Sequence, residues 1–181
     1  MADIRPFRGV RFHSVRFGQD VSRLVCPPFD VISPQLQSQL YEQDPHNMIR
    51  LELTRKDSAE GGDRYAQAAA DYAAWLAEGV LAQDDTPALY LYQCRFSVAD
   101  VPQERHGLIA ALHLEPWERR IVRPHERVLP GAIEDRIQLM RACRANFSPI
   151  WGLYRDPLDT TAALWESASL AWATTLPRQH R

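Results

Sequence analysis

The sequence predicts an α+β protein with a small mixed sheet that contains an antiparallel hairpin and is flanked by about four helices. Two patterns lead to this prediction. Residues 63–78 repeat apolar side chains at helical spacing, whereas residues 88–96 and 106–114 alternate along the chain with a period of two. Apolar residues make up 45% and charged residues 24% of the 181 residues, as in ordinary globular proteins. We therefore expect one domain over residues 1–181, with no independent second domain.

The N-terminal part contains two segments stiffened by proline. Residues 4–10 are predicted as a strand that Pro6 interrupts, which places it at a sheet edge or bulge. Residues 26–30, Cys-Pro-Pro-Phe-Asp, form an extended segment because proline disfavours helix at its own position and the one before. Asp30 therefore projects from a stiff loop, either as a functional acid or as a residue that closes a turn through backbone amides.

Helix signals follow this loop. Ser33 and Pro34 suit the N-cap and first turn of a helix over residues 34–44. Residues 48–53 alternate well enough to predict a strand. The clearest helix is predicted over residues 63–78, with Gly79 as its end.

The two alternating segments are predicted to pair as an antiparallel hairpin across a polar connection at residues 97–105. One face of the first strand carries Tyr90, Tyr92, Cys94 and Phe96. This apolar face predicts that the hairpin belongs to the core.

The stretch from Val122 to Gly152 is rich in ionisable residues. Pro124 and Pro130 bracket His125, Glu126 and Arg127, so we expect these three on a stiff loop.

The same stretch continues with a predicted helix over residues 132–144 and a buried strand over residues 150–154. A last helix is expected over residues 157–173, where Trp165 and Trp172 require a surface to pack against.

This charged stretch has two interpretations. Charged helix faces are usually solvated, and Glu134, Gln138 and Arg141 fit an ordinary exposed face. Alternatively, the loop presents an imidazole, a carboxylate and a guanidinium beside a helix start that favours anions. A zinc-protease motif is not formed, since Leu129 stands where the second histidine would be required, and no metal site is predicted.

Composition narrows the classes of partner. The formal net charge of −2 argues against a dedicated nucleic-acid binder, even though five arginines lie among phenylalanines in residues 5–23. Cys26, Cys94 and Cys143 are far apart and odd in number, which favours free thiols in a reducing compartment. With no signal-peptide pattern and no membrane-length apolar run, we expect a cytoplasmic protein without membrane contact.

Five sequence blocks resemble one protein family. The blocks are residues 4–11 (Ile-Arg-Pro-Phe-Arg-Gly-Val-Arg), 26–34 (Cys-Pro-Pro-Phe-Asp-Val-Ile-Ser-Pro), 123–127 (Arg-Pro-His-Glu-Arg), 134–136 (Glu-Asp-Arg) and 144–150 (Arg-Ala-Asn-Phe-Ser-Pro-Ile). In this order they resemble the bacterial and archaeal family catalogued as domain of unknown function 1015. Val128 departs from the family, which commonly has threonine there.

The resemblance implies a fold related to ParB-like and sulfiredoxin-like proteins. Family members typically continue into a second half with an Ala-Asp-Gly-His-His-Arg motif, so this chain is expected to be the N-terminal portion of a longer protein. Either that missing C-terminal half or a second copy is an expected partner.

The resemblance also implies a function similar to that of kinases that phosphorylate free serine with ATP, or another nucleotide, and magnesium. Asp30 and Glu126 would then be catalytic carboxylates, as base or magnesium ligand. The nucleotide or the substrate carboxylate would be bound by a set of polar and basic residues, namely His125, Arg127, Arg136, Arg141, Arg144 and Asn146. Arg144 and Asn146 lie at the end of the predicted helix, and their alternative role is to cap it. By itself this chain is expected to be inactive.

Two other functions stay open from the sequence. No Walker loop or dinucleotide fingerprint is present, so nucleotide binding follows from the resemblance alone. The chain is therefore also consistent with a non-catalytic module that binds a nucleotide or anion and switches partners. A third alternative is a protein interaction domain that presents Trp165 and Trp172.

Overall fold

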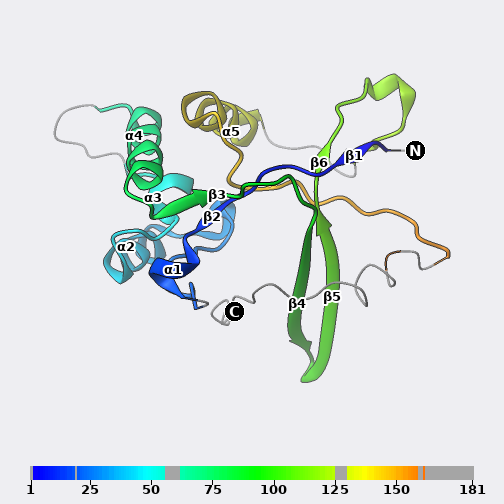
Figure 1. Cartoon of the computed structure of the whole chain (residues 1–181), viewed down its shortest axis with the longest axis horizontal. Coiled ribbons are helices and arrows are strands. Elements are labelled where there is room, and N and C mark those ends of the chain that lie inside the picture. Colours follow the sequence, from blue (N-terminus) through cyan, green and yellow to red (C-terminus); the bar gives the residue numbers. More distant parts are fainter. Residues whose placement is uncertain (1, 19, 56–61, 125–129, 159–160, 162–181) are drawn as a thin grey trace. The chain divides into compact units, whose positions relative to one another are not determined.

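The computed structural model describes residues 2–18, 20–55, 62–124, 130–158 and 161. These residues form helices and three separate two-stranded sheets (Figure 1). The pairs are β1 (Ile4–Arg5) with β6 (Ala111–Leu112), β2 (Val10–Phe12) with β3 (Leu81–Gln83), and β4 (Tyr90–Val98) with β5 (Val101–Ile109). The predicted α+β class is confirmed, although the strands form three pairs instead of one mixed sheet. None of the helices in the described ranges is long and apolar enough to span a membrane.

The chain divides into two compact units. The hairpin unit comprises Met1–Val10, Gln83–Arg127 and Gly152–Ser169, and the helical unit comprises Arg11–Ala82, Val128–Trp151 and Leu170–Arg181. The hairpin unit holds β1 (Ile4–Arg5), β4 (Tyr90–Val98), β5 (Val101–Ile109), β6 (Ala111–Leu112) and the 3-10 turn η2 (Trp117–Arg119). The helical unit holds α1 (Ser14–Phe17), η1 (Phe29–Val31), α2 (Pro34–Gln43), α3 (Ile49–Glu52), α4 (Arg64–Ala77) and α5 (Pro130–Cys143). Two of the boundaries between the units fall within β2 (Val10–Phe12) and β3 (Leu81–Gln83).

Local capping explains why α2 and α4 lie where the sequence predicts them. Ser33 caps α2 by accepting a hydrogen bond from the Leu36 amide at 3.2 Å, and Asp63 caps α4 by accepting one from the Tyr65 amide at 2.9 Å. Gly79 ends α4 with a positive φ of 67°, a conformation that glycine adopts without strain. Helix α5 is also confirmed, but it begins at Pro130 instead of residue 132.

The predicted strand at residues 48–53 is wrong, because this segment forms α3. Asn47 is fully buried, and its side chain accepts a hydrogen bond from the Ile49 amide at 3.0 Å, which starts the helical turn. The same side chain donates to the Arg23 and Val25 carbonyl oxygens at 2.7 and 3.1 Å. A tertiary anchor thus overrides the alternating pattern.

The core of the helical unit lies between its helices. Ala68 on α4 packs with Leu139 and Cys143 on α5, and Tyr72 and Phe147 cover this cluster. Ala68 has no exposed surface, so the two helices approach closely at this position.

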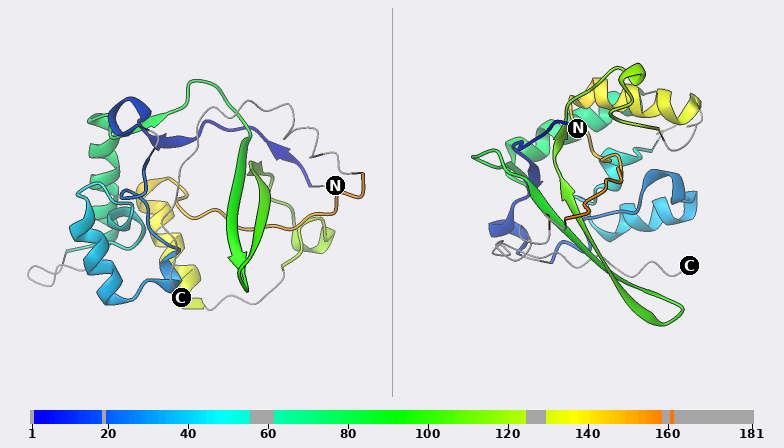
Figure 2. Two further views of the ribbon diagram at one scale, coloured as in Figure 1. Left: turned by 90° about the horizontal axis from the view of Figure 1, so that it is seen from below. Right: turned by 90° about the vertical axis from the view of Figure 1, so that its right-hand side faces the viewer.

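The hairpin of β4 and β5 is confirmed, but its connection is far shorter than predicted. Val98 pairs with Val101, so only Ala99 and Asp100 form the turn. Both have positive φ, 48° and 62°, as in a type I′ turn whose twist matches that of the strands (Figure 2). The expectation that the hairpin is core is wrong, because Tyr92 and Phe96, on the predicted apolar face, are 40% and 36% exposed.

Two further predictions concern the C-terminal part. Residues 150–154 form no strand, and Ile150 and Leu153 are each 92% exposed. A β-prone segment forms a strand only when another strand pairs with it, and none of the described residues does so here. The predicted helix at 157–173 lies almost entirely outside the described residues.

Candidate functional site

A cluster of partly buried charges lies in the helical unit, where α5 meets α3. Arg136 on α5 donates from Nη1 to the Glu52 carboxylate at 2.9 Å and from Nη2 to the Glu52 carbonyl oxygen at 3.0 Å. The side chains of Arg136 and Glu52 are 20% and 5% exposed. Charges this far from water are costly unless they are paired, so the two groups depend on each other.

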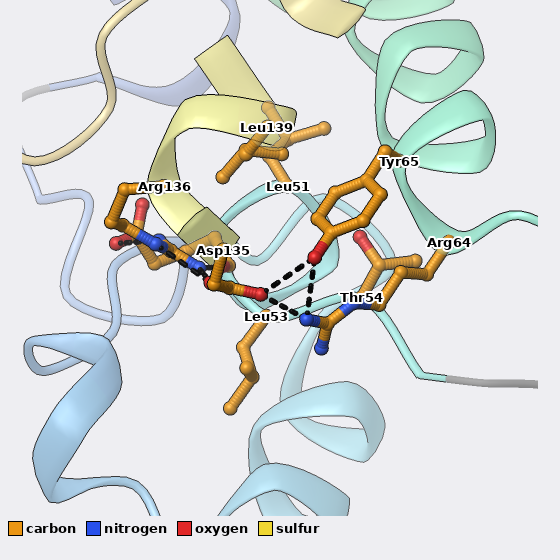
Figure 3. Close-up of a pocket in the computed structure, with 9 residues that line it drawn as sticks. Leu51, Leu53, Thr54, Arg64, Tyr65, Asp135, Arg136 and Leu139 are labelled. Carbon is orange, nitrogen blue, oxygen red and sulfur yellow. Dashed lines mark hydrogen bonds and ion pairs between the residues drawn. The ribbon is translucent and has the colours of Figure 1, made fainter. Parts of the chain in front are cut away.

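Asp135 extends the cluster toward α4. Its Oδ1 accepts a hydrogen bond from the Tyr65 hydroxyl at 2.9 Å and pairs with Arg64, while its Oδ2 accepts from Arg136 Nε at 2.9 Å (Figure 3). Burial by itself would raise the pKa of Asp135, but the hydrogen bonds from Arg136 and Tyr65 and the nearby positive charges outweigh it. The pKa of this carboxyl therefore lies below its usual value.

The loop of residues 26–30 lies beside the same cluster. The Phe29 ring centroid is 4.0 Å from the guanidinium carbon of Arg136, a stacked cation–π contact. Burial, helped by the negative charge of Glu52, raises the pKa of the Cys26 thiol to about 12. Cys26 is therefore a neutral thiol at physiological pH and a poor nucleophile.

A third segment reaches Glu52 from beyond the end of α5. The Ser148 hydroxyl donates to Glu52 Oε1, the same oxygen that Arg136 contacts. The ion pair of Glu52 and Arg136 is therefore where three segments meet: the loop of residues 26–30 through Phe29, helix α5 through Arg136, and the segment that contains Ser148.

The open space at the cluster is small. A cavity of about 10 Å³ is lined by Leu51, Glu52, Leu53, Thr54, Arg64, Tyr65, Asp135, Arg136 and Leu139. This volume holds about one water molecule, so a nucleotide does not fit in this arrangement.

Magnesium does not fit the described residues either. Glu52 and Asp135 are both engaged by arginines, and no group of three or more His, Cys, Asp or Glu side chains in the described ranges is arranged to bind a metal. A carboxylate that neutralises a guanidinium has less negative charge available for a cation.

The predicted site residues do not all lie in the cluster around Glu52. Arg136 lies in the cluster, and Asp30 follows Phe29 in η1 with its side chain exposed. Arg144 has a positive φ of 51°, and its amide donates to the Met140 carbonyl oxygen at 2.8 Å, which closes the end of α5. Arg141 and Asn146 are exposed, and His125, Glu126 and Arg127 lie outside the described residues.

Sequence reasoning missed Glu52, Arg64, Tyr65 and Ser148. Glu52 lies between two leucines in an apolar segment, which is a weak signal for a buried carboxylate. Arg64 and Tyr65 belong to the first turn of α4, where polar residues are ordinary. Ser148 lies inside the block Arg-Ala-Asn-Phe-Ser-Pro-Ile and was the easiest of the four to select.

Comparison with known proteins gives one relationship. No curated protein and no solved structure matches the chain. A family model described as "Protein of unknown function (DUF1015)" matches residues 4–176. This match covers nearly the whole chain, and the chain therefore belongs to the DUF1015 family.

Proposed function

We propose that the chain is the N-terminal portion of a nucleotide-dependent, kinase-like protein that phosphorylates a small hydroxyl-bearing substrate such as free serine. A ParB-like ancestry is part of this proposal. Phosphoryl transfer requires positive groups around the transferred phosphate and a carboxylate near the attacking hydroxyl. The cluster around Glu52 contains both kinds of group.

The convergence of separate sequence blocks carries this proposal. Residues 26–34, 134–136 and 144–150 carry the resemblance, and each contributes one contact to the cluster: Phe29, Arg136 and Ser148. A buried ion pair is weak evidence for stability, since apolar residues of similar size often serve the fold equally well. A charged cluster built from three distant blocks therefore favours a functional role for Glu52 and Arg136.

The proposal also gives roles to other predicted residues. Asp30, one residue after Phe29, supplies a solvent-exposed carboxylate. His125, Glu126 and Arg127 are assigned to phosphate, magnesium or substrate on the resemblance alone. Because the described carboxylates do not form a magnesium site, no catalytic step is assigned to that ion.

The direct test is turnover by the full-length protein. The protein is incubated with γ-labelled ATP, magnesium and free serine, and phosphoserine is separated and counted. We expect product with the wild type and none with Glu126→Gln, whose thermal melting should match the wild type. Product formation that is unchanged in Glu126→Gln would remove this residue from the site, and no product with any small hydroxyl substrate would overturn the kinase proposal.

A non-catalytic anion-binding switch is the second candidate. It is favoured by one observation: Arg64 and Arg136 already pair with Asp135 and Glu52. An incoming anion would therefore have to replace an internal carboxylate, which couples binding to a local rearrangement. Saturable ATP binding without product in the same assay would favour this function, whereas no ligand effect on the melting temperature would favour an interaction domain.

A further inference from the structure

The hairpin unit has an apolar surface but no apolar core in its described residues. Every buried hydrophobic side chain in the described ranges belongs to the helical unit. On the hairpin, Tyr92, Phe96, Val98 and Val101 are 36–57% exposed. A two-stranded hairpin is only marginally stable in water, so this unit is expected to gain stability from a further surface.

The two edges of the hairpin differ in their protection. Because Val98 and Val101 flank a two-residue turn, they form a hydrogen-bonded pair. From there, non-hydrogen-bonded and hydrogen-bonded pairs alternate along the ladder, and the residues of each non-hydrogen-bonded pair direct their backbone groups outward. The outward backbone groups of β5 therefore belong to Pro102, Glu104, His106 and Leu108, and those of β4 to Leu91, Gln93, Arg95 and Ser97. Pro102 has no N–H to donate, so the β5 edge is protected against a further strand. Charge does not distinguish the two edges, because Glu104 on β5 lies opposite Arg95 on β4.

The edge of β4 is open by comparison. It contains no proline, and none of the described strands pairs with it from Leu91 onward. The nearest bridge joins Phe7 to Ala88, before β4 begins. An open edge of this kind accepts an added strand through backbone hydrogen bonds.

The sequence of β4 is complementary to itself when two copies run antiparallel. The strand Tyr90–Val98 has its midpoint at Cys94, and a two-fold axis there pairs all nine residues. Tyr92 of each copy then lies opposite Phe96 of the other copy, which gives two equivalent aromatic pairs on the apolar face. Arg95 lies opposite the neutral Gln93, whereas an axis at Arg95 would place two positive charges directly opposite each other.

We propose that β4 pairs with β4 of a second copy of this chain, which gives a four-stranded antiparallel sheet with the two-fold axis at Cys94. The sheet sets Tyr92 and Phe96 of the two copies side by side on one face, where each covers part of the other, and it satisfies the outward amides of β4. This inference does not depend on the proposed function.

The native cysteines provide the sharpest test. Cys94 faces its symmetry mate in a non-hydrogen-bonded pair, where the Cα atoms lie about 4.5 Å apart, within the range that disulfides span. Oxidation of the full protein with copper phenanthroline should give a disulfide-linked dimer that Cys94→Ser abolishes. Cys143 is buried, and the raised pKa of the Cys26 thiol keeps it neutral, so neither should cross-link.

A matched pair of proline variants tests the edge itself. Gln93 and His106 lie directly opposite each other in the hairpin, and the backbone N–H of each points outward, so neither substitution removes a backbone hydrogen bond within the hairpin. Each substitution removes one side-chain hydrogen bond to Glu104, so the two variants are matched in this respect as well. In light scattering, Gln93→Pro should weaken dimerisation about tenfold or more, whereas His106→Pro should leave it unchanged. Circular dichroism and thermal melting confirm that both variants fold.

Two results would overturn the proposal. One is a protein that stays monomeric at all accessible concentrations and gives no Cys94 cross-link, in which case another part of the protein or a different partner covers the hairpin. The other is a dimer that His106→Pro disrupts as strongly as Gln93→Pro.

Discussion

Each unit of the protein contains an arginine–glutamate pair, and the two pairs have the same length in very different surroundings. In the helical unit, Arg136 Nη1 lies 2.9 Å from Glu52 Oε1, and in the hairpin unit, Arg95 Nε lies 2.9 Å from Glu104 Oε2. The first pair is 20% and 5% exposed, the second 76% and 38%. The length of the ion pair therefore says little about how much either pair contributes to the stability of the fold.

Burial determines how much stability is lost when one partner of an ion pair is removed. Loss of one partner in the helical unit leaves a charge with little access to water, whereas water replaces a lost partner on the hairpin. The same comparison explains why the cluster around Glu52 is a candidate site and the exposed pair is not.

The largest effect is expected for Glu52→Gln. This substitution keeps the shape of the side chain but removes the negative charge that neutralises the partly buried guanidinium of Arg136, so the free energy of unfolding should fall by about 3–5 kcal/mol. Urea unfolding measures the change. Glu134→Gln is the control, because Glu134 is exposed on α5, the helix that carries Arg136. This variant should change the free energy of unfolding by less than about 0.5 kcal/mol. Equal losses of stability in Glu52→Gln and Glu134→Gln would contradict the claim that burial makes the Glu52–Arg136 pair more important than an exposed charge.

An intermediate effect is expected for Asp135→Asn. The substitution weakens charge-assisted hydrogen bonds to Arg64 and Arg136, and should cost about 1.5–3 kcal/mol at pH 7. Because the pKa of Asp135 is lowered on folding, its stabilisation is present above the ordinary Asp pKa of about 4 and disappears as the pH falls through the folded value. Unfolding curves of wild type and variant should therefore converge in acid, and a constant difference down to the acid limit would contradict this account.

The smallest effect is expected for Glu104→Gln. Hydrogen bonds from Arg95, Gln93 and His106 lower the pKa of Glu104 to about 2, yet the group is exposed, and salt screens such pairs. The melting temperature should stay within the error of the measurement. A loss as large as that of Glu52→Gln would show that the hairpin pair is buried in solution, for example by a second copy.

Elements defined by neighbouring residues were predictable from the sequence. Helices α2 and α4 carry their own caps, Ser33 and Asp63, within the segment that they start. The hairpin was recognisable from its alternation, but its turn was not, since Ala99 and Asp100 lack the Asn-Gly signature of a type I′ turn. Without that signature, the polar residues on β5 have the composition of a connection between strands.

Elements defined by distant partners were not predictable. Glu52 and Arg136 are 84 residues apart, so no local pattern indicates their pairing. Helix α3 depends on the buried side chain of Asn47, whose partners include carbonyl groups more than 20 residues away. Of the predicted site residues, Arg136 was found through the resemblance, and Glu52 had no motif to mark it.

Asn47 also offers a spectroscopic reporter. Its side-chain amide donates to two carbonyls just before the Cys-Pro-Pro-Phe-Asp loop and has no exposed surface. In a two-dimensional nitrogen–proton NMR spectrum, its two NH₂ protons should exchange slowly with solvent and resonate apart from those of exposed amides. Displacement of that pair of signals on addition of a ligand would register movement of the loop without any label at the cluster itself.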